Sequence, residues 1–354
     1  MREINVSTNE AGQRLDKLLR KYLKNANTSF IYKMLRKKNI VLNDKKAEGK
    51  EILNLGDSVK MYFSEETFAT MTGQYSGSAE TKRTTSSAGK SSAQTRRGES
   101  SGNSSERRDK RAFDIDGFRK HIVYEDENLL VLNKPAGWLS QSDASGLPSV
   151  NELCLRYLMA TGALTETQLQ TFKPGIANRL DRNTSGLILF GKTLPALQAL
   201  AGLLRDRTME KYYLAIVYGD IAHAQRIDGY LAKDERTNRV EIRPQPFPDA
   251  VEIHTAYEPL KRSTDYTVLK VHLITGKTHQ IRAHLRAIGH PIIGDPKYGR
   301  KDANAYYRSH GGVTSQLLHA WELHFPETLD GPLRNLAGQT ITAAPPKDFR
   351  AFLQ

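Results

Sequence analysis

The segment Arg179-Leu-Asp-Arg-Asn-Thr-Ser-Gly186 is the part of the sequence best suited to chemistry. Two arginines lie close to one aspartate, and neighbouring positive charge keeps a carboxylate ionised. An ionised carboxylate at the edge of a strand can act as a nucleophile, a general base or an electrostatic stabiliser. The alternative is a purely structural turn, in which Asp181 caps backbone N–H groups and the arginines are surface charges. The segment by itself leaves both interpretations open.

A nucleotide-binding signature, G-x-x-x-x-G-K-T, overlaps this segment at residues 186–193. A phosphate-binding loop needs glycine-rich turn residues whose backbone N–H groups point at the anion. The four central residues are instead apolar: Leu187, Ile188, Leu189 and Phe190. Such a run predicts a buried strand whose N–H groups are engaged in a sheet. The sequence therefore argues against nucleoside triphosphate binding and predicts a strand directly after the charged turn.

The histidines do not form a convincing metal site. His279 and His284 are five residues apart on an expected helix over residues 278–288, whereas ligands on one helix face are three or four apart. Cys154 is the only cysteine and lies in an apolar run, which indicates a buried side chain. We expect neither a metal nor a cofactor. His290 follows the same expected helix and is considered with this pair, whereas the histidines in unrelated segments are interpreted as structural: His121, His254, His272 and His310.

The composition indicates a polyanionic partner. The chain has 354 residues, a formal net charge of +13 and an isoelectric point near 9.6. Nucleic acid is favoured over a membrane, because no amphipathic basic anchor accompanies the charge. The N-terminus lacks an apolar signal region, and no segment reaches the ~18 apolar residues of a membrane span. We expect a cytoplasmic, monomeric protein without membrane contact.

A change of composition divides the chain. Residues 64–113 are rich in Ser, Thr and Gly and predict a flexible linker between a small module, residues 1–63, and a large one, residues 114–354. Lys and Arg outnumber Asp and Glu by 14 to 7 before residue 64, by 9 to 6 over residues 64–112 and by 29 to 26 after them. The excess positive charge is thus concentrated in the N-terminal module.

In the N-terminal module, apolar residues at helical spacing predict two helices, and an alternating pattern after them predicts strands. The first helix covers residues 15–23, the second begins near Thr28 or Ser29, and strands follow near residues 40–42 and 59–63. The outer face of the second helix carries four cations: Lys33, Arg36, Lys37 and Lys38. A solvated helix surface would also have this composition.

The large module alternates short strands with helices. Strands are expected near residues 121–124, 128–132, 186–190, 212–217 and 266–274, and helices over residues 150–159, 194–205 and 278–288. Several strands follow one another without an intervening helix. We therefore predict an α+β fold with a mainly antiparallel, mixed sheet rather than a doubly wound one.

Motifs in both modules resemble known families. In the small module, Arg14-Leu-Asp-Lys-Leu-Leu19, the segment 31–43 and Gly56-Asp57 resemble the S4 RNA-binding domain over about 50 residues, which implies that the basic face contacts RNA. In the large module, five separated motifs are similar in order to the RluA-type pseudouridine synthases, and most of all to the RluC/RluD-type enzymes of large-subunit ribosomal RNA. These motifs are Asn133-Lys-Pro-Ala-Gly137, Arg179-Leu-Asp181, Lys211-Tyr-Tyr213, residues 273–299 and Leu318-His-Ala320.

The resemblance implies an isomerase that flips uridines out of RNA and converts them to pseudouridine in a site from which water is excluded. Asp181 would drive cleavage of the N-glycosidic bond, Tyr213 would lie against the uracil and act in removing the C5 proton, and Arg282 would pair with the catalytic carboxylate. Arg179 would fill the gap left by the flipped base, and Leu318 would line the uracil pocket. The implied substrate is 23S ribosomal RNA or a pre-50S particle. Transfer RNA, and a non-catalytic RNA-binding or ribosome-assembly role, are the alternatives.

One residue departs from the family pattern. The family usually has His-Arg-Leu-Asp, whereas this chain has Asn178 before Arg179. Either side chain can donate a hydrogen bond, so the departure leaves the role of Asp181 intact and the role of position 178 open.

Overall fold

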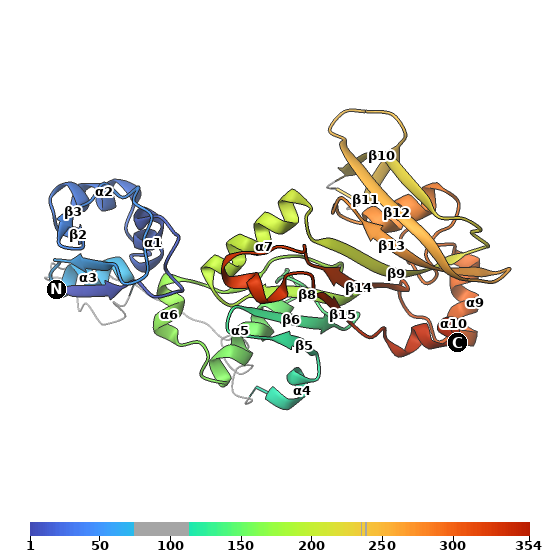
Figure 1. Ribbon diagram of the computed structural model, residues 1–354, viewed down its shortest axis with the longest axis horizontal. Helices are drawn as coiled ribbons and strands as arrows, with labels where there is room; N and C mark the ends of the chain where they lie inside the picture. The colour runs from blue at the N-terminus through green and yellow to red at the C-terminus, as the bar shows by residue number, and fades with distance from the viewer. Residues whose placement is uncertain (74–112, 235, 238) are drawn as a thin grey trace, which may run out of the picture.

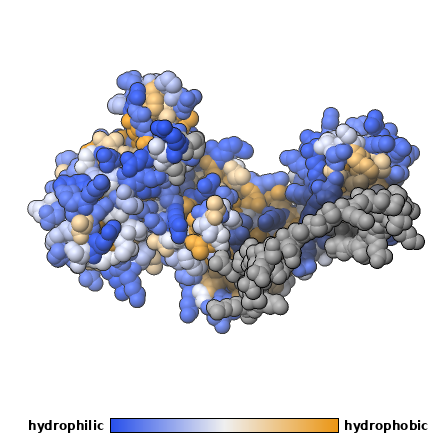
Figure 2. All heavy atoms as spheres, turned by 180° about the vertical axis from the view of Figure 1, so that it is seen from behind, coloured by the Kyte–Doolittle hydropathy of each residue, from blue (hydrophilic) through white to orange (hydrophobic). Residues whose placement is uncertain are grey.

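The computed structural model describes residues 1–73, 113–234, 236–237 and 239–354. Two separate hydrophobic cores are present, one drawn from residues before position 72 and the other from residues after position 112. Figure 1 shows the first core as a small N-terminal unit beside a larger unit built on one long sheet. Figure 2 shows hydrophilic side chains over most of the opposite face of the molecule.

The N-terminal unit packs helices on a small sheet with the strand order β1-β4-β2-β3. Asn43 and Asp44 have φ values of 50° and 60°, as a two-residue hairpin between β2 and β3 requires. The predicted helices and strands are present, and Lys33, Arg36, Lys37 and Lys38 are all exposed. The elements are β1 (Arg2–Asn5), α1 (Leu15–Tyr22), α2 (Thr28–Arg36), β2 (Ile40–Leu42), β3 (Lys45–Lys46), β4 (Ser58–Met61) and α3 (Glu65–Thr72).

Helix α3 corrects the predicted start of the linker. Residues 65–72 were expected to belong to a flexible segment, but they form a helix that Ser64 caps through a hydrogen bond from Thr67 N. Phe68 on this helix is 1% exposed and packs against Tyr22 and Phe63. A single aromatic residue in a polar stretch thus extends the N-terminal core. The rest of the predicted linker, residues 74–112, lies outside the described residues.

The larger unit contains an 11-stranded sheet. Its main path has the order β11-β10-β12-β13-β9-β14-β8-β6-β5, while β15 pairs with β14 and β7 with β8. All the strand pairs are antiparallel except β8 with β14, which confirms the predicted α+β fold with a mainly antiparallel, mixed sheet. The strands are β5 (Ile122–Glu125), β6 (Leu129–Lys134), β7 (Gly175–Ile176), β8 (Ser185–Gly191), β9 (Glu210–Tyr218), β10 (Gln225–Asp234), β11 (Arg239–Arg243), β12 (Val251–Arg262), β13 (Tyr266–Leu273), β14 (Leu318–His324) and β15 (Thr340–Thr342).

Helices lie on both sides of this sheet, with α7 on one side and α5 and α6 on the other (Figure 1). The sequence pattern located α5 and α7 well, but it gave no indication of α6, in which only Thr171 is buried, or of α9, which has no buried residue. The helices are α4 (Ile115–Arg119), α5 (Val150–Ala160), α6 (Glu166–Thr171), α7 (Leu194–Asp206), α8 (Gln280–Ala287), α9 (Lys301–Gly311) and α10 (Arg350–Leu353), with 3-10 turns at η2 (Gly331–Leu336) and η3 (Lys347–Phe349). None of the helices in the described ranges is both long and apolar enough to cross a membrane.

Strand β8 accounts for the apparent nucleotide-binding signature. All seven of its residues are buried, and Thr193 directly after it caps α7 by accepting a hydrogen bond from Ala196 N. Gly186 has a φ of +110°, and a Cβ atom there would lie 2.1 Å from the carbonyl oxygen of Ala320 on β14. Gly186 is therefore needed for close strand pairing, and the backbone of β8 is committed to the sheet, as predicted.

We expect Phe68→Ala to destabilise the N-terminal unit by about 3–5 kcal/mol, because the substitution leaves a cavity in a small core. Hydrogen exchange should report faster exchange of the α1 and α2 amides with unchanged protection of β8. Thr70→Ala, an exposed position on the same helix, is the matched control. Unchanged protection in Phe68→Ala would show that α3 is not part of the core.

Candidate active site

A cleft of about 1280 Å³ contains the charged turn identified in the sequence. Its walls come from the loop before β8, from β9, and from the segment between β13 and α8. The lining contains two carboxylates, Asp143 and Asp181, and nine cationic side chains: Arg179, Arg182, Arg205, Arg207, Lys211, Lys233, Lys277, Arg282 and Lys297. Nine cations against two carboxylates make this cleft suitable for a polyanion.

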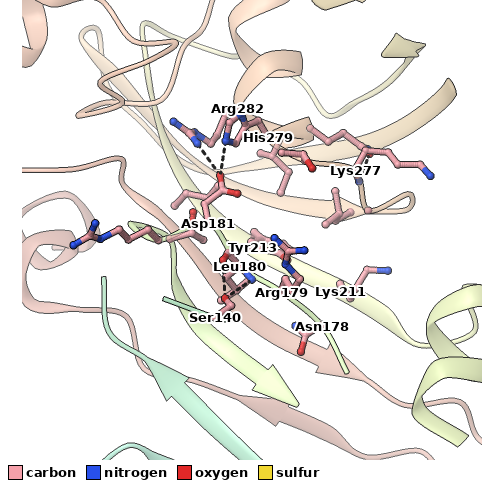
Figure 3. Close-up of a pocket in the computed structure, with 18 of the residues that line it drawn as sticks. Ser140, Asn178, Arg179, Leu180, Asp181, Lys211, Tyr213, Lys277, His279 and Arg282 are labelled. Atoms are coloured by element: carbon pink, nitrogen blue, oxygen red, sulfur yellow. Dashed lines mark hydrogen bonds and ion pairs between the residues drawn. The ribbon is translucent and has the colours of Figure 1, made fainter. Parts of the chain in front are cut away.

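The backbone around Asp181 is held by the neighbouring loop that follows β6. Ser140 Oγ donates to the carbonyl oxygen of Leu180 at 2.7 Å and accepts from the amide nitrogen of Leu180 at 3.0 Å. Gly137 N donates to the carbonyl oxygen of Arg182 at 2.9 Å. Thr184 N closes the turn on the carbonyl oxygen of Asp181 at 3.0 Å. The residues on either side of Asp181 are therefore fixed while its side chain points into the cleft (Figure 3).

The buried side chain of Lys134 is hydrogen-bonded to the same turn. Its side chain is 0% exposed, and Nζ donates to the carbonyl oxygens of Pro135, Trp138 and Arg182 at 2.9–3.0 Å. Burial lowers the pKa of Lys134 to about 7, although the charge of Asp181 opposes the shift. One buried side chain thus ties the loop after β6 to the turn that carries Asp181.

Arg282, on α8, holds the Asp181 carboxylate. Its Nη1 donates to Asp181 Oδ2 at 2.7 Å, while Nε and Nη2 donate to the two carboxylate oxygens of Asp295 at 2.7 and 2.9 Å. Asp295 is 0% exposed, and its Oδ1 also accepts from the amide nitrogens of Lys297 and Tyr298. Burial alone would lower the pKa of Arg282, but its bonds to Asp295 and the nearby charge of Asp181 raise it overall. Arg282 is therefore a permanent cation beside Asp181.

Arg179 and Arg182 lie next to Asp181 in the sequence, but the guanidinium that pairs with Asp181 is that of Arg282, 101 positions away. This is the pairing that the family resemblance implied. Arg182 Nε instead donates to the carbonyl oxygen of Gly137 at 3.2 Å, and Arg179 is exposed in the cleft wall.

His279 also faces Asp181. It precedes α8 in the left-handed conformation with a φ of 55°, so the helix begins at Gln280 rather than at the predicted residue 278. Its Nε2 lies 3.9 Å from Asp181 Oδ2, and its Nδ1 is hydrogen-bonded to the hydroxyl of Tyr298 at 3.0 Å. Burial lowers the pKa of His279, although the charge of Asp181 opposes the shift. Among the described residues, no group of three His, Cys, Asp or Glu side chains could hold a metal ion.

Strand β9 brings Lys211 and Tyr213 to the cleft. They are two residues apart and therefore lie on one face of the strand. Burial, reinforced by the charge of Asp181, raises the pKa of Tyr213 well above its usual range, so the phenol keeps its proton at neutral pH. Burial also lowers the pKa of Lys211, with a contribution from Arg207. Leu318, 4% exposed at the start of β14, supplies apolar wall to the same cleft.

Asn178 has a clear structural role. Its Nδ2 donates to the carbonyl oxygen of Leu187 at 3.2 Å, and its Oδ1 accepts from Leu189 N at 2.8 Å. The side-chain amide therefore bonds to β8 as a strand backbone would, directly after β7 pairs with the same strand. Asn178 aligns the chain that leads into Arg179 and Asp181.

Comparisons with known proteins agree with this geometry. Residues 128–287 match the RNA pseudouridylate synthase family. The chain is 30% identical to the ribosomal large subunit pseudouridine synthase C of Pasteurella multocida over 93% of its own length and 87% of that protein. The protein of the same name from Vibrio cholerae is 29% identical, with 91% and 88% covered.

The chain belongs to the RNA pseudouridine synthase family. The match extends across most of the chain rather than over one motif, and it confirms the family indicated by the sequence. A solved structure of human RNA pseudouridylate synthase domain containing 4 has the same fold, with a TM-score of 0.53 and 20% identity over 66% of this chain and 92% of the human one.

The structure brings together most of the residues singled out in this pseudouridine synthase from its sequence. Asp181, Arg282, Tyr213, Arg179 and Leu318 all line one cleft. Lys33, Arg36, Lys37 and Lys38 lie elsewhere, on and just after α2 of the N-terminal unit. Sequence reasoning missed Lys134, Asp295 and His279, although each lies inside a motif that had been quoted. Their spacing gave no sign of contact with the charged turn.

We expect Asp295→Asn to lower both stability and turnover. Breaking one partner of a buried ion pair costs about 3–5 kcal/mol, and Arg282 would lose the group that orients it toward Asp181. Urea unfolding and single-turnover rates measure the two effects. Asp302→Asn removes a carboxylate from an exposed pair with Arg300 and should change neither. Full turnover in Asp295→Asn would show that Asp295 does not position Arg282.

Proposed function

We propose that this enzyme isomerises specific uridines of large-subunit ribosomal RNA to pseudouridine, with Asp181 as the catalytic carboxylate. The observation that carries the proposal is the Asp181–Arg282 ion pair at the base of a cationic cleft. Relatives named ribosomal large subunit pseudouridine synthase C, which align with about nine-tenths of the chain, support the choice of RNA.

The reaction rearranges one nucleotide without oxidation, reduction or net addition of water. The N1–C1′ bond of uridine breaks, the uracil turns, and a C5–C1′ bond forms, after which C5 loses its proton and N1 gains one. An ionised carboxylate can stabilise positive charge at C1′ or bond to the sugar. Arg282 keeps Asp181 oriented for either role, because the guanidinium is itself held by Asp295.

We assign Tyr213 to the uracil. A buried phenol on the cleft wall offers an apolar face and one hydroxyl, which suits contact with a flat base. Because its pKa is raised, Tyr213 is protonated at neutral pH. It can therefore help to remove the C5 proton only if its own proton passes to another acceptor.

Two further assignments concern access to the base. Arg179 is exposed beside Asp181, and a long cationic side chain there can occupy the space that a flipped base leaves in an RNA helix. Leu318 gives the pocket an apolar wall opposite the charged groups. Exclusion of water by such a wall protects the separated base and sugar.

We assign the N-terminal unit to an S4-type RNA-binding domain, connected to the catalytic domain of residues 114–354. Its exposed cations, Lys33, Arg36, Lys37 and Lys38, contact RNA phosphates in this proposal. We expect the enzyme to act in the cytoplasm as a monomer on 23S ribosomal RNA or a pre-50S particle. A transfer RNA substrate is the second candidate, because recognition of RNA shape does not depend on the ribosome.

We expect Asp181→Asn to abolish turnover while RNA affinity stays within about twofold, since Asn is isosteric and Arg282 keeps Asp295 as a partner. Pseudouridine mapping by carbodiimide-dependent primer-extension stops, in a deletion strain rescued by wild type or variant, tests this directly. Ribosomal sites restored only by the wild type support the proposal. Sites restored equally by both would remove Asp181 from the chemistry, and loss confined to transfer RNA would change the substrate. No change at any site would favour a non-catalytic RNA-binding role.

We expect replacement of Lys33, Arg36, Lys37 and Lys38 by Gln to weaken RNA binding and to flatten its salt dependence. Each lost phosphate contact reduces the slope of log K against log salt by about 0.7, or roughly 3 for all four. Affinity measured by filter binding over a range of salt concentrations gives the slope. Arg262→Gln, an exposed arginine paired with Asp220, serves as a control for general charge loss. An unchanged slope would mean that the basic helix face is only solvated.

A further inference from the structure

The N-terminal unit makes a specific contact with the larger unit. The carboxylate of Glu10 accepts hydrogen bonds from the hydroxyl of Thr171, at the end of α6, and from Ser7 N at 2.9 Å. Glu10 is 4% exposed and Thr171 is 6% exposed. Gln198 Nε2, on α7, donates to the carbonyl oxygen of Gly12 at 3.3 Å. A buried carboxylate with a single partner across the boundary marks a defined docking contact rather than a chance encounter of surfaces.

Lys21 of α1 reinforces this contact. Its Nζ lies 5.9 Å from the centroid of the buried Phe172 ring and donates to Gln13 Oε1 at 3.0 Å. Burial, with the charge of Lys17, lowers the pKa of Lys21, and the charge of Glu10 opposes the shift. A lysine placed against an aromatic ring of the other unit gains a cation–π interaction that it would lose on separation.

Two segments of the larger unit lead from this contact to residues that line the cleft. Phe172 and Arg179 are separated by seven residues (179 − 172), and the intervening chain runs along β7 beside β8. Gln198 and Arg205 are also separated by seven residues (205 − 198), on the single helix α7, which corresponds to about 10 Å. Arg179 and Arg205 both line the cleft. Two short segments of the larger unit therefore connect the docking contact to the cationic cleft.

Exposed cations lie on both units. Lys33 and Arg36 on α2, and Lys37 directly after it, are exposed on the N-terminal unit. Arg205 and Arg207, at the end of α7, are exposed and line the cleft. In Figure 1, α7 lies between the N-terminal unit and strands β9 and β13. A polyanion that leaves the cleft along α7 toward Gln198 would therefore reach the N-terminal unit.

We propose that the Glu10–Thr171 contact docks the N-terminal unit against α6 and α7 and joins its basic face to the cleft as one RNA-binding surface. This surface takes a structured RNA long enough to span both units. The inference rests on the proposed function for the identity of the polyanion. Docking fixes the two sites at one separation, and a fixed separation raises the effective concentration of the second site once the first is bound.

The test uses Thr171→Val in the full chain. Valine keeps the shape of the side chain but removes the hydrogen bond that Glu10 accepts from the larger unit and leaves Glu10 Oε1 buried without that donor, so release of the N-terminal unit becomes more favourable. Thr161→Val is the matched control, because that hydroxyl at the end of α5 bonds only to Tyr157 and Leu158 of its own helix. Spin labels at Lys46→Cys and Ala163→Cys, both exposed positions, report the separation of the units, while the single native cysteine, Cys154, is buried.

We expect a narrow distance distribution in the parent and in Thr161→Val, and a broad one in Thr171→Val. Affinity for a long structured fragment of ribosomal RNA should fall about 5- to 10-fold in Thr171→Val. Affinity for, and single-turnover rate on, a short stem-loop that occupies only the cleft should be unchanged. A distribution that stays narrow in Thr171→Val overturns the docking contact. A broad distribution with unchanged or tighter binding of the long RNA overturns the joint surface.

These outcomes are separate from failure of the proposed function. The distance distribution does not depend on RNA, and the binding comparison does not depend on turnover. If no uridine is converted but the docked state binds the long RNA more tightly, the docking inference stands and the proposed catalysis fails.

Discussion

The active site depends on one guanidinium held between two carboxylates. Arg282 directs two of its nitrogens to Asp295 and a third to Asp181. Asp295 is buried and anchored by backbone amides, so it acts as the fixed end of the arrangement. The free side of Arg282 then determines where the Asp181 carboxylate lies. A buried cation would be costly without such partners, and here the cost is offset by two acids with different exposure. The buried acid is structural, and the accessible one faces the cleft.

Other groups position the backbone rather than the charge. Lys134, Ser140 and Gly137 bind the carbonyl and amide groups on both sides of Asp181, and Asn178 aligns the approach to it along β8. The family usually has histidine where this chain has Asn178. An amide offers a donor and an acceptor at the same time, and both are used here on neighbouring backbone groups of one strand. Asn178 is therefore bonded to the strand through both ends of its amide.

The sequence predicted those features that local pattern controls. The apolar runs 187–190 and 212–217 predicted strands β8 and β9, whereas the family resemblance assigned Tyr213 to the site. The sequence could not predict contacts between residues that are far apart in the chain and meet only in the folded structure. Lysine is usually a surface residue, yet Lys134 is buried because the carbonyl oxygens of Pro135, Trp138 and Arg182 accept its three hydrogen bonds. Asp295 and Arg282 are 13 residues apart, a spacing that no local rule singles out. Helix α3 was missed because Phe68 is surrounded by polar residues, so its burial is determined by Tyr22 and Phe63.

The parallel pairing of β8 with β14 is the narrowest junction along the main path of the long sheet, since it joins only His319 with Ser185 and Ala320 with Gly186. On one side of this seam lies the strand that follows Asp181; on the other lie β9, β13 and the helix that carries Arg282. The Asp181–Arg282 ion pair therefore spans this seam, together with the buried hydrogen bond between Ser185 and His319. A bound molecule that draws the carboxylate away from the guanidinium removes one of the side-chain contacts between the two halves of the sheet.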